Sequence, residues 1–226
     1  MSLRSFAGQA AAAAAITCVA SFATAGTLNT SGWIAPPPEV FTVTSPVSND
    51  NDYTGGFTGD FNGTPINFWC FELNQYFNVG SSYTYEASDL ADPIYYPAIG
   101  QLFNQHSFGA TVSPLASAAF QLAIWEIRYD SAPGHLPYDL TTGQLTAVGD
   151  LATIVLANSW LSGLAGPSRV VTLLHSDTNQ DFITIGSPGR DCCRDVPEPT
   201  TLPLMGLALG GMAFIASRRS RKARGL

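Results

Sequence analysis

The sequence predicts an α+β fold: a β-rich domain, sandwich- or barrel-like, with a three-helix insertion, followed by a C-terminal transmembrane helix. Residues 41–61 are rich in Thr, Val, Phe, Gly and Asn, a composition typical of short strands joined by turns. Residues 93–161 carry apolar side chains at helical spacing. The apolar run from Leu202 to Ala216 lies at the short end of the roughly 17–25 residues that a membrane-spanning helix needs.

Strands are expected on both sides of the helical region. Residues 65–71 form a compact aromatic segment, and residues 82–86 alternate tyrosines with polar residues, as a half-buried strand does. Residues 169–175 and 182–185 are expected to close the sheet after the helices. The polar residues 49–52 are interpreted as a turn.

Three helices are predicted, over about 93–106, 114–129 and 142–161. The second has the clearest start, because Ser113 is a good N-cap residue and Pro114 suits the first helical position. The third is predicted from an apolar stripe formed by Leu145, Val148, Leu151, Ile154 and Val155.

The first 25 residues have the features of a signal peptide. Arg4 precedes the alanine-rich run 10–20, and Ala23-Thr24-Ala25 is an A-x-A cleavage site that leaves Gly26 as the new N-terminus. An alanine-rich run also favours a structural helix. Secretion is the preferred interpretation, because the run lacks amphipathic spacing.

The other end of the chain has three parts in a fixed order. Residues 196–199 read Val-Pro-Glu-Pro, residues 201–217 form the predicted transmembrane helix, and residues 218–226 are basic. Pro197 and Pro199 prevent a regular helix or central strand across Glu198. The basic tail is expected to stay in the cytoplasm under the positive-inside rule.

This order closely resembles the PEP-CTERM sorting signal of Gram-negative bacteria, with Pro197, Glu198 and Pro199 as its motif. The resemblance implies that the export machinery delivers the protein and that an exosortase processes it near the motif. The protein is then expected to be anchored in the inner membrane at least transiently, before it reaches the cell surface or the extracellular matrix. An ordinary single-pass tail anchor is the alternative.

The middle region, residues 26–195, is strongly acidic. All seventeen acidic residues of the chain lie in this region or in the sorting motif, and the region has only four arginines and no lysine. The sole lysine is Lys222, in the basic tail. An acidic surface of this kind excludes nucleic acid as an expected partner.

Two short motifs in the middle region carry possible chemistry. One is Phe-Trp-Cys-Phe-Glu-Leu at residues 68–73, and the other is Ala-Ala-Phe-Gln-Leu-Ala-Ile-Trp-Glu at residues 118–126. They resemble the thioester domain of bacterial surface adhesins, in which a cysteine sulfur is joined to a glutamine side-chain carbonyl. The matching residues are Cys70 and Gln121, while Phe120 stands where the family usually has threonine.

The thioester interpretation is chemically coherent. A surface amine attacks the acyl carbon and the thiolate leaves, so that an amide forms. Aromatic residues such as Trp69 and Trp125 are expected to exclude water and slow hydrolysis. Glu72 or Glu126 is a candidate for assisting proton transfer. The absence of lysine from the middle region protects such a bond from self-reaction, although compositional bias explains it as well.

Other roles for these residues stay open. Cys70 is alternatively a buried small side chain or a disulfide partner, and Gln121 a polar residue on a solvated helix face. Three cysteines remain after removal of the signal peptide, so at least one has no partner within the monomer. Cys192 and Cys193 are expected to pair with each other, with another molecule or, one of them, with Cys70.

Two functions therefore compete. The first is a surface or matrix protein that attaches to amines through a Cys70–Gln121 thioester. The second is a non-covalent structural or carbohydrate- and partner-binding component of the exopolysaccharide layer. No enzymatic activity, cofactor or metal is expected, because the sequence contains no nucleotide-binding, catalytic-triad or metal-ligand motif.

Overall fold

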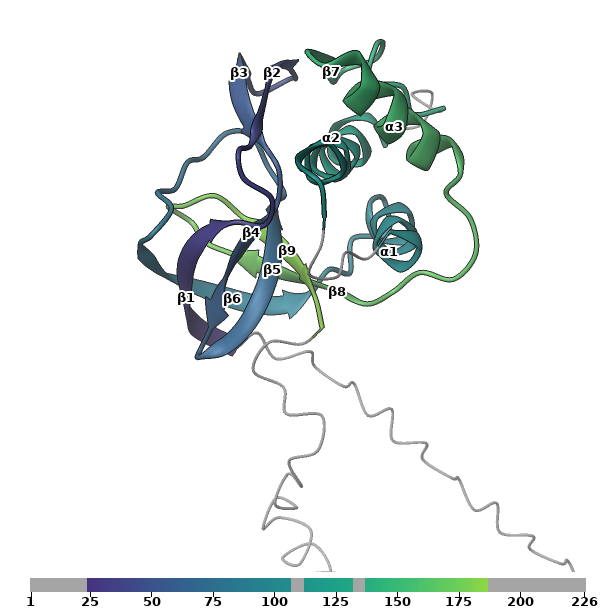
Figure 1. Ribbon diagram of the computed structural model, residues 1–226. Helices are drawn as coiled ribbons and strands as arrows, with labels where there is room; N and C mark the ends of the chain where they lie inside the picture. The colour runs from purple at the N-terminus through teal and green to yellow at the C-terminus, as the bar shows by residue number, and fades with distance from the viewer. Residues whose placement is uncertain (1–23, 107–111, 132–136, 187–226) are drawn as a thin grey trace, which may run out of the picture. The chain divides into compact units, whose positions relative to one another are not determined.

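The computed structural model describes residues 24–106, 112–131 and 137–186. Figure 1 shows the barrel strands on one side of this region and three helices on the other. Six strands form a closed antiparallel barrel in the order β1-β4-β5-β9-β8-β6. They are β1 (Thr24–Trp33), β4 (Phe57–Phe61), β5 (Thr64–Cys70), β6 (Ser82–Asp89), β8 (Val171–His175) and β9 (Phe182–Ile185).

Aromatic rings fill the barrel. Phe68 packs against Phe57 and Phe182, with ring centroids 5.6 and 4.8 Å apart. The Tyr85 ring lies 5.6 Å from that of Phe182, and its hydroxyl donates to the Gln180 carbonyl. Edge-to-face and offset contacts of this kind add to the stability gained from apolar burial.

A second, three-stranded sheet has the order β3-β2-β7 and lies beside the helices (Figure 1). It consists of β2 (Glu39–Thr44), β3 (Asn49–Thr54) and β7 (Thr146–Val148). The inward residues Phe41 and Val43 of β2 are fully buried, whereas the alternating residues Val40, Thr42 and Thr44 are exposed. This alternation is the pattern of a sheet with one covered face.

The helices are α1 (Tyr96–Gln105), α2 (Pro114–Asp130) and α3 (Leu151–Ser162). Helix α2 begins as the sequence predicts, because the Ser113 side chain accepts a hydrogen bond from the Ala116 N–H. Every side chain from residue 117 to 127 is buried, so α2 is enclosed on all sides rather than amphipathic. It contacts α1, α3, β2 and β3.

The β-rich fold and its three helices agree with the sequence prediction, but one strand was missed and two local predictions are wrong. Strand β1 was not predicted, and residues 49–52 lie in β3 rather than in a turn. The third helix does not begin at residue 142. Residues 146–148 of the predicted helix form strand β7 instead. Helix α3 begins only after Asp150, whose side chain caps the helix by accepting the Thr153 N–H.

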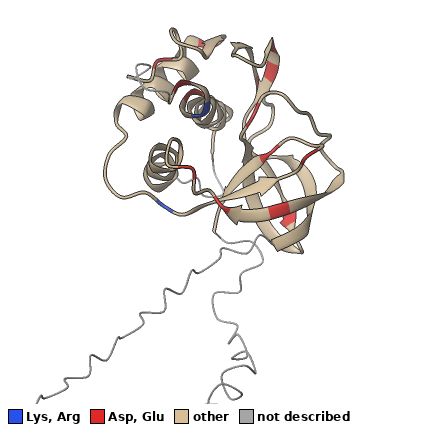
Figure 2. Cartoon of the chain, turned by 180° about the vertical axis from the view of Figure 1, so that it is seen from behind, with Lys and Arg blue, Asp and Glu red and all other residues tan. Residues whose placement is uncertain are grey.

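The domain is acidic over the part that the structure describes. Its basic residues there are Arg128 and Arg169 alone, and Figure 2 shows acidic positions spread over strands and helices. Arg128 is held by Tyr95, whose hydroxyl accepts from the guanidinium at 2.6 Å. Its guanidinium also lies 4.6 Å from the Tyr95 ring centroid, a cation–π distance.

Candidate functional site

Cys70 and Gln121 come from different elements and meet in the interior. Cys70 is the last residue of β5, and Gln121 lies in the second turn of α2. Their exposed fractions are 6 % and 0 %. Gln121 is therefore not on a solvated helix face, and the structure brings together the two residues that the sequence motifs predict.

The Gln121 carboxamide makes two hydrogen bonds to the backbone of Cys70. The Cys70 N–H donates to Gln121 Oε1 at 3.0 Å, and Gln121 Nε2 donates to the Cys70 carbonyl at 2.8 Å. Both bonds are buried. The carboxamide thus pairs with the Cys70 backbone as one residue of a neighbouring strand would.

The end of a strand creates the place for this contact. The first residue of β4, Phe57, pairs with Phe68, so Cys70 lies two residues beyond the last β4 partner. On its other edge, Cys70 pairs with Phe182 of β9. Beyond Phe68, β5 has no β4 partner, and helix α2 covers this edge of the strand. The Gln121 side chain hydrogen-bonds there to the Cys70 N–H and carbonyl, which would otherwise be buried without a partner.

Ser117 makes the same kind of contact one helical turn before Gln121. Its hydroxyl accepts a hydrogen bond from the Gly56 N–H at 2.9 Å, in a buried position. Ser117 and Gln121 are four residues apart and therefore lie on one face of α2. This polar face docks the helix onto the ends of two strands and sets the position of Gln121.

The surroundings of the Cys70 sulfur keep it uncharged. Burial raises the pKa of the Cys70 thiol well above its ordinary value, and the negative charges of Asp52 and Glu72 raise it further. A thiol of this kind is a poor free nucleophile at neutral pH, because the thiolate is the reactive form. A reaction of the Cys70 sulfur therefore requires a reactive neighbouring group that the fold already holds in position.

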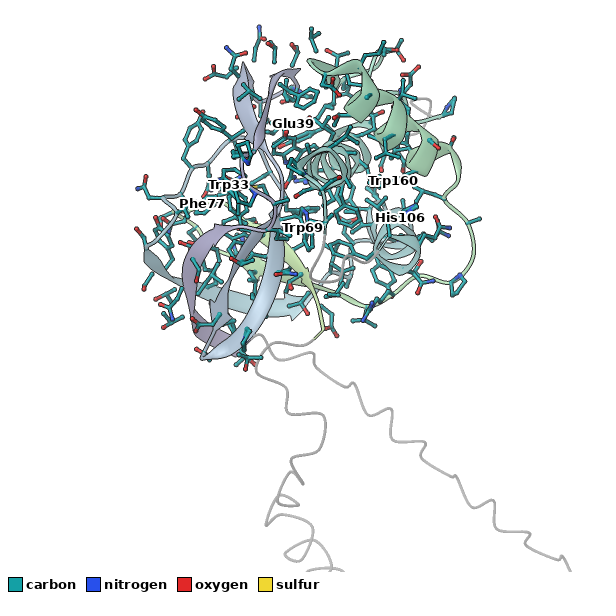
Figure 3. The ribbon with its side chains drawn as sticks, viewed as in Figure 1. Trp33, Glu39, Trp69, Phe77, His106 and Trp160 are labelled. Carbon is teal, nitrogen blue, oxygen red and sulfur yellow. The ribbon has the colours of Figure 1, made fainter. Side chains whose placement is uncertain are left out.

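Cys70 lines a pocket of about 320 Å³ between the barrel and the β2–β3 hairpin. Aromatic residues form much of its wall: Trp33, Tyr53, Phe57, Tyr76, Phe77 and Trp125. Tyr53 and Tyr76 are 65 % and 70 % exposed and stand at the rim. Figure 3 shows Trp33 and Phe77 on the side of the domain away from His106 and Trp160.

Three polar atoms of the pocket wall are buried and make no hydrogen bond within the described part of the chain. They are Asp52 Oδ2, Gln75 Oε1 and Trp125 Nε1. Sequence reasoning found only Trp125, as an aromatic shield, and missed Asp52 because residues 49–52 were assigned to a turn. Buried polar groups without partners are uncommon and point to a ligand, an ion or water.

The two glutamates considered for proton transfer differ in position. Glu72 is half-buried, and its carboxylate accepts the Asp181 N–H at 3.2 Å. Burial raises the pKa of Glu72, and its charge is among those that act on Cys70. Glu126 instead accepts the Asp139 N–H at 2.8 Å and does not line the pocket.

The sorting segment lies outside the residues that the structure describes, as do Cys192, Cys193 and most of the signal peptide. Strand β1 begins at Thr24, two residues before the predicted new N-terminus at Gly26. In the described ranges, no helix is long and apolar enough to cross a membrane.

A comparison with protein families decides the nature of the C-terminal segment. Residues 195–222 match the family model described as the PEP-CTERM protein-sorting motif. The chain carries a PEP-CTERM sorting motif. This motif implies export, a C-terminus anchored in the membrane before sorting, and an exosortase as the processing partner.

The comparisons say nothing about the domain that precedes the motif. No curated protein and no solved structure matches the chain. The resemblance of the Cys70 and Gln121 motifs to the thioester domain of surface adhesins therefore has no support from relatives.

Proposed function

We propose that this protein is an exosortase-sorted surface protein whose domain acylates primary amines through an internal thioester between Cys70 and Gln121. The observation that carries the proposal is the pair of buried hydrogen bonds between the Gln121 carboxamide and the Cys70 backbone. A protein that works outside the cell, without ATP, gains a covalent attachment in this way. The lysine-free domain is spared reaction with its own side chains.

Formation of the bond is balanced by loss of ammonia. The Cys70 sulfur adds to Cδ of Gln121, and the thiol proton passes to Nε2, which leaves as ammonia. The Cys70 N–H already donates to Oε1, the oxygen that becomes negatively charged in the tetrahedral intermediate. A preorganised donor at that oxygen is a large contribution to catalysis of acyl transfer.

The packing around the site supports a long-lived bond. Trp69 lies on the helix side of β5, with its ring centroid 5.4 Å from that of Phe103 and 5.1 Å from that of Phe120 (Figure 3). Gln121 is completely inaccessible to solvent. Gln121, which would supply the acyl carbon, is thus shielded from water, and this shielding limits hydrolysis.

Intact-mass measurement of the purified domain tests the proposal. We expect the wild-type domain to be lighter than its sequence by one ammonia, and Cys70→Ser and Gln121→Ala to have their full masses. Gln101→Ala, a change on α1 outside the pocket, is the matched control and should keep the mass deficit. A full wild-type mass together with a free Cys70 thiol in fresh protein refutes the thioester.

That negative result favours the second candidate, a non-covalent binding component of the exopolysaccharide layer. The observation in its favour is the aromatic pocket with unpartnered polar atoms, which requires no covalent bond. Flat aromatic side chains such as Trp33 and Tyr53 suit the apolar faces of sugars. Retention of the wild-type domain on an exopolysaccharide column, lost in Trp33→Ala, tests this function separately.

A further inference from the structure

We propose that the pocket beside Cys70 recognises a primary alkylammonium group, such as a lysine side chain, and that Asp52 binds this group and removes its proton. The inference rests on the proposed thioester for its chemical outcome. Binding of the ammonium depends on the pocket alone, because the pocket residues are present whether or not the thioester forms.

The unpartnered atoms have the polarity that an ammonium needs. Asp52 Oδ2 and Gln75 Oε1 are both acceptors, and both are buried in the pocket wall without a donor from the described residues. An ammonium offers three N–H donors and no acceptor. Each buried acceptor left unpaired is costly, so a donor that reaches both is strongly favoured.

The Trp125 indole N–H indicates that the ligand also offers a hydrogen-bond acceptor. The Trp125 side chain is 2 % exposed, and its Nε1–H lines the pocket without an acceptor. Trp125 lies four residues after Gln121, on the same face of α2. A lysine residue satisfies this donor as well, because it presents a peptide carbonyl in addition to its ammonium.

The aromatic wall favours a cation over a neutral polar group. The Phe57 ring centroid is 4.2 Å from that of Trp33 and 4.9 Å from that of Phe77, so the three rings pack against one another in the pocket wall. Cations are attracted to the faces of such rings. Among the described residues that line the pocket, none is basic, so no internal cation competes with the ligand.

Asp52 is suited to take the proton. Burial raises the pKa of Asp52 above its ordinary value, and the charge of Asp50 raises it further, which makes the carboxylate a stronger base. Asp52 and Cys70 line the same pocket, and the charge of Asp52 contributes to the raised pKa of the Cys70 thiol. The ammonium gives one proton to Asp52, and the free amine attacks Cδ of Gln121. The Sγ–Cδ bond then breaks, and the second amine proton passes to sulfur, so the products are a secondary amide and the Cys70 thiol.

Binding of n-butylammonium to the Cys70→Ser variant tests recognition without the covalent step. We expect saturable binding in a fluorescence or NMR titration, no saturation with 1-butanol, and binding at least about tenfold weaker in Cys70→Ser/Asp52→Asn. Cys70→Ser/Asp50→Asn is the matched control, because Asp50 is an exposed carboxylate on the same strand and its loss changes the net charge equally.

Two results overturn the inference. One is equal binding of n-butylammonium by the Asp52 and Asp50 variants, and the other is binding of 1-butanol or a neutral sugar as tightly as the ammonium. Neither result affects the mass deficit of the wild-type domain, so failure of the recognition site and failure of the thioester are measured separately.

Discussion

Replacing Glu126 with glutamine should stabilise the domain at neutral pH. Glu126 is 1 % exposed, its Oε1 accepts the Asp139 N–H, and its Oε2 is buried without a partner among the described residues. Burial raises the pKa of this carboxyl to about 8, and the charges of Asp130 and Asp139 raise it as well. Glutamine keeps the acceptor for Asp139 and cannot ionise.

The expected size of the effect follows from linkage. Because the folded-state pKa is raised, the protonated carboxyl stabilises the fold fully below the unfolded-state pKa of 4.5, and this contribution is lost as the pH rises through about 8. Each pH unit in that window corresponds to about 1.4 kcal/mol. The wild type should therefore lose about 3 kcal/mol from this group by pH 7, and about 4 kcal/mol by pH 8.

Urea unfolding of both proteins between pH 4 and pH 9 measures this difference. Glu126→Gln should match the wild type at pH 4 and exceed its free energy of unfolding increasingly towards pH 8. Glu86→Gln, at an exposed position of β6, makes the same change of charge and should show no such trend. Parallel pH profiles for the wild type and Glu126→Gln contradict the assignment of a buried, neutral carboxyl.

Two further substitutions test how α2 and α3 are placed. Ser117→Ala removes the acceptor of the buried Gly56 N–H, so chemical denaturation should show a loss of about 1–3 kcal/mol, and an unchanged midpoint contradicts the docking role. Asp150→Ala removes the side-chain cap that accepts the Thr153 N–H and should cost about 1 kcal/mol, seen as a lower melting temperature. Asp150→Ser should recover most of that loss, and equal melting of both Asp150 variants argues against capping.

Local signals predicted some elements well. Ser113 and Pro114 mark the start of α2 because capping and a fixed φ depend on neighbouring residues only. The start of the third helix was predicted too early in the chain, because the apolar stripe of the helix extends back into β7. Strand β7 forms by pairing with β2, which is far away in the sequence. Gly149 and Asp150 separate β7 from α3. A Cβ at Gly149 would lie 2.3 Å from the Phe41 ring, so this close approach requires glycine.

The candidate site was predictable only in part. The spacing and composition of two motifs singled out Cys70 and Gln121, and the structure joins them by hydrogen bonds. The pocket in front of Cys70 was not predictable, because Asp52 and Gln75 reach it from a strand and a loop whose positions depend on the whole barrel. A polar strand such as β3 has no alternating pattern to distinguish it from a turn.

Methylamine labelling of the native domain, followed by peptide mass spectrometry, tests the central claim most directly. The thioester predicts that one methylamide appears on Gln121 as one alkylatable thiol appears on Cys70, in equal amounts and at the same rate. A Cys70 thiol that is alkylated in the denatured domain before any amine is added, with Gln121 left unmodified by methylamine, contradicts it.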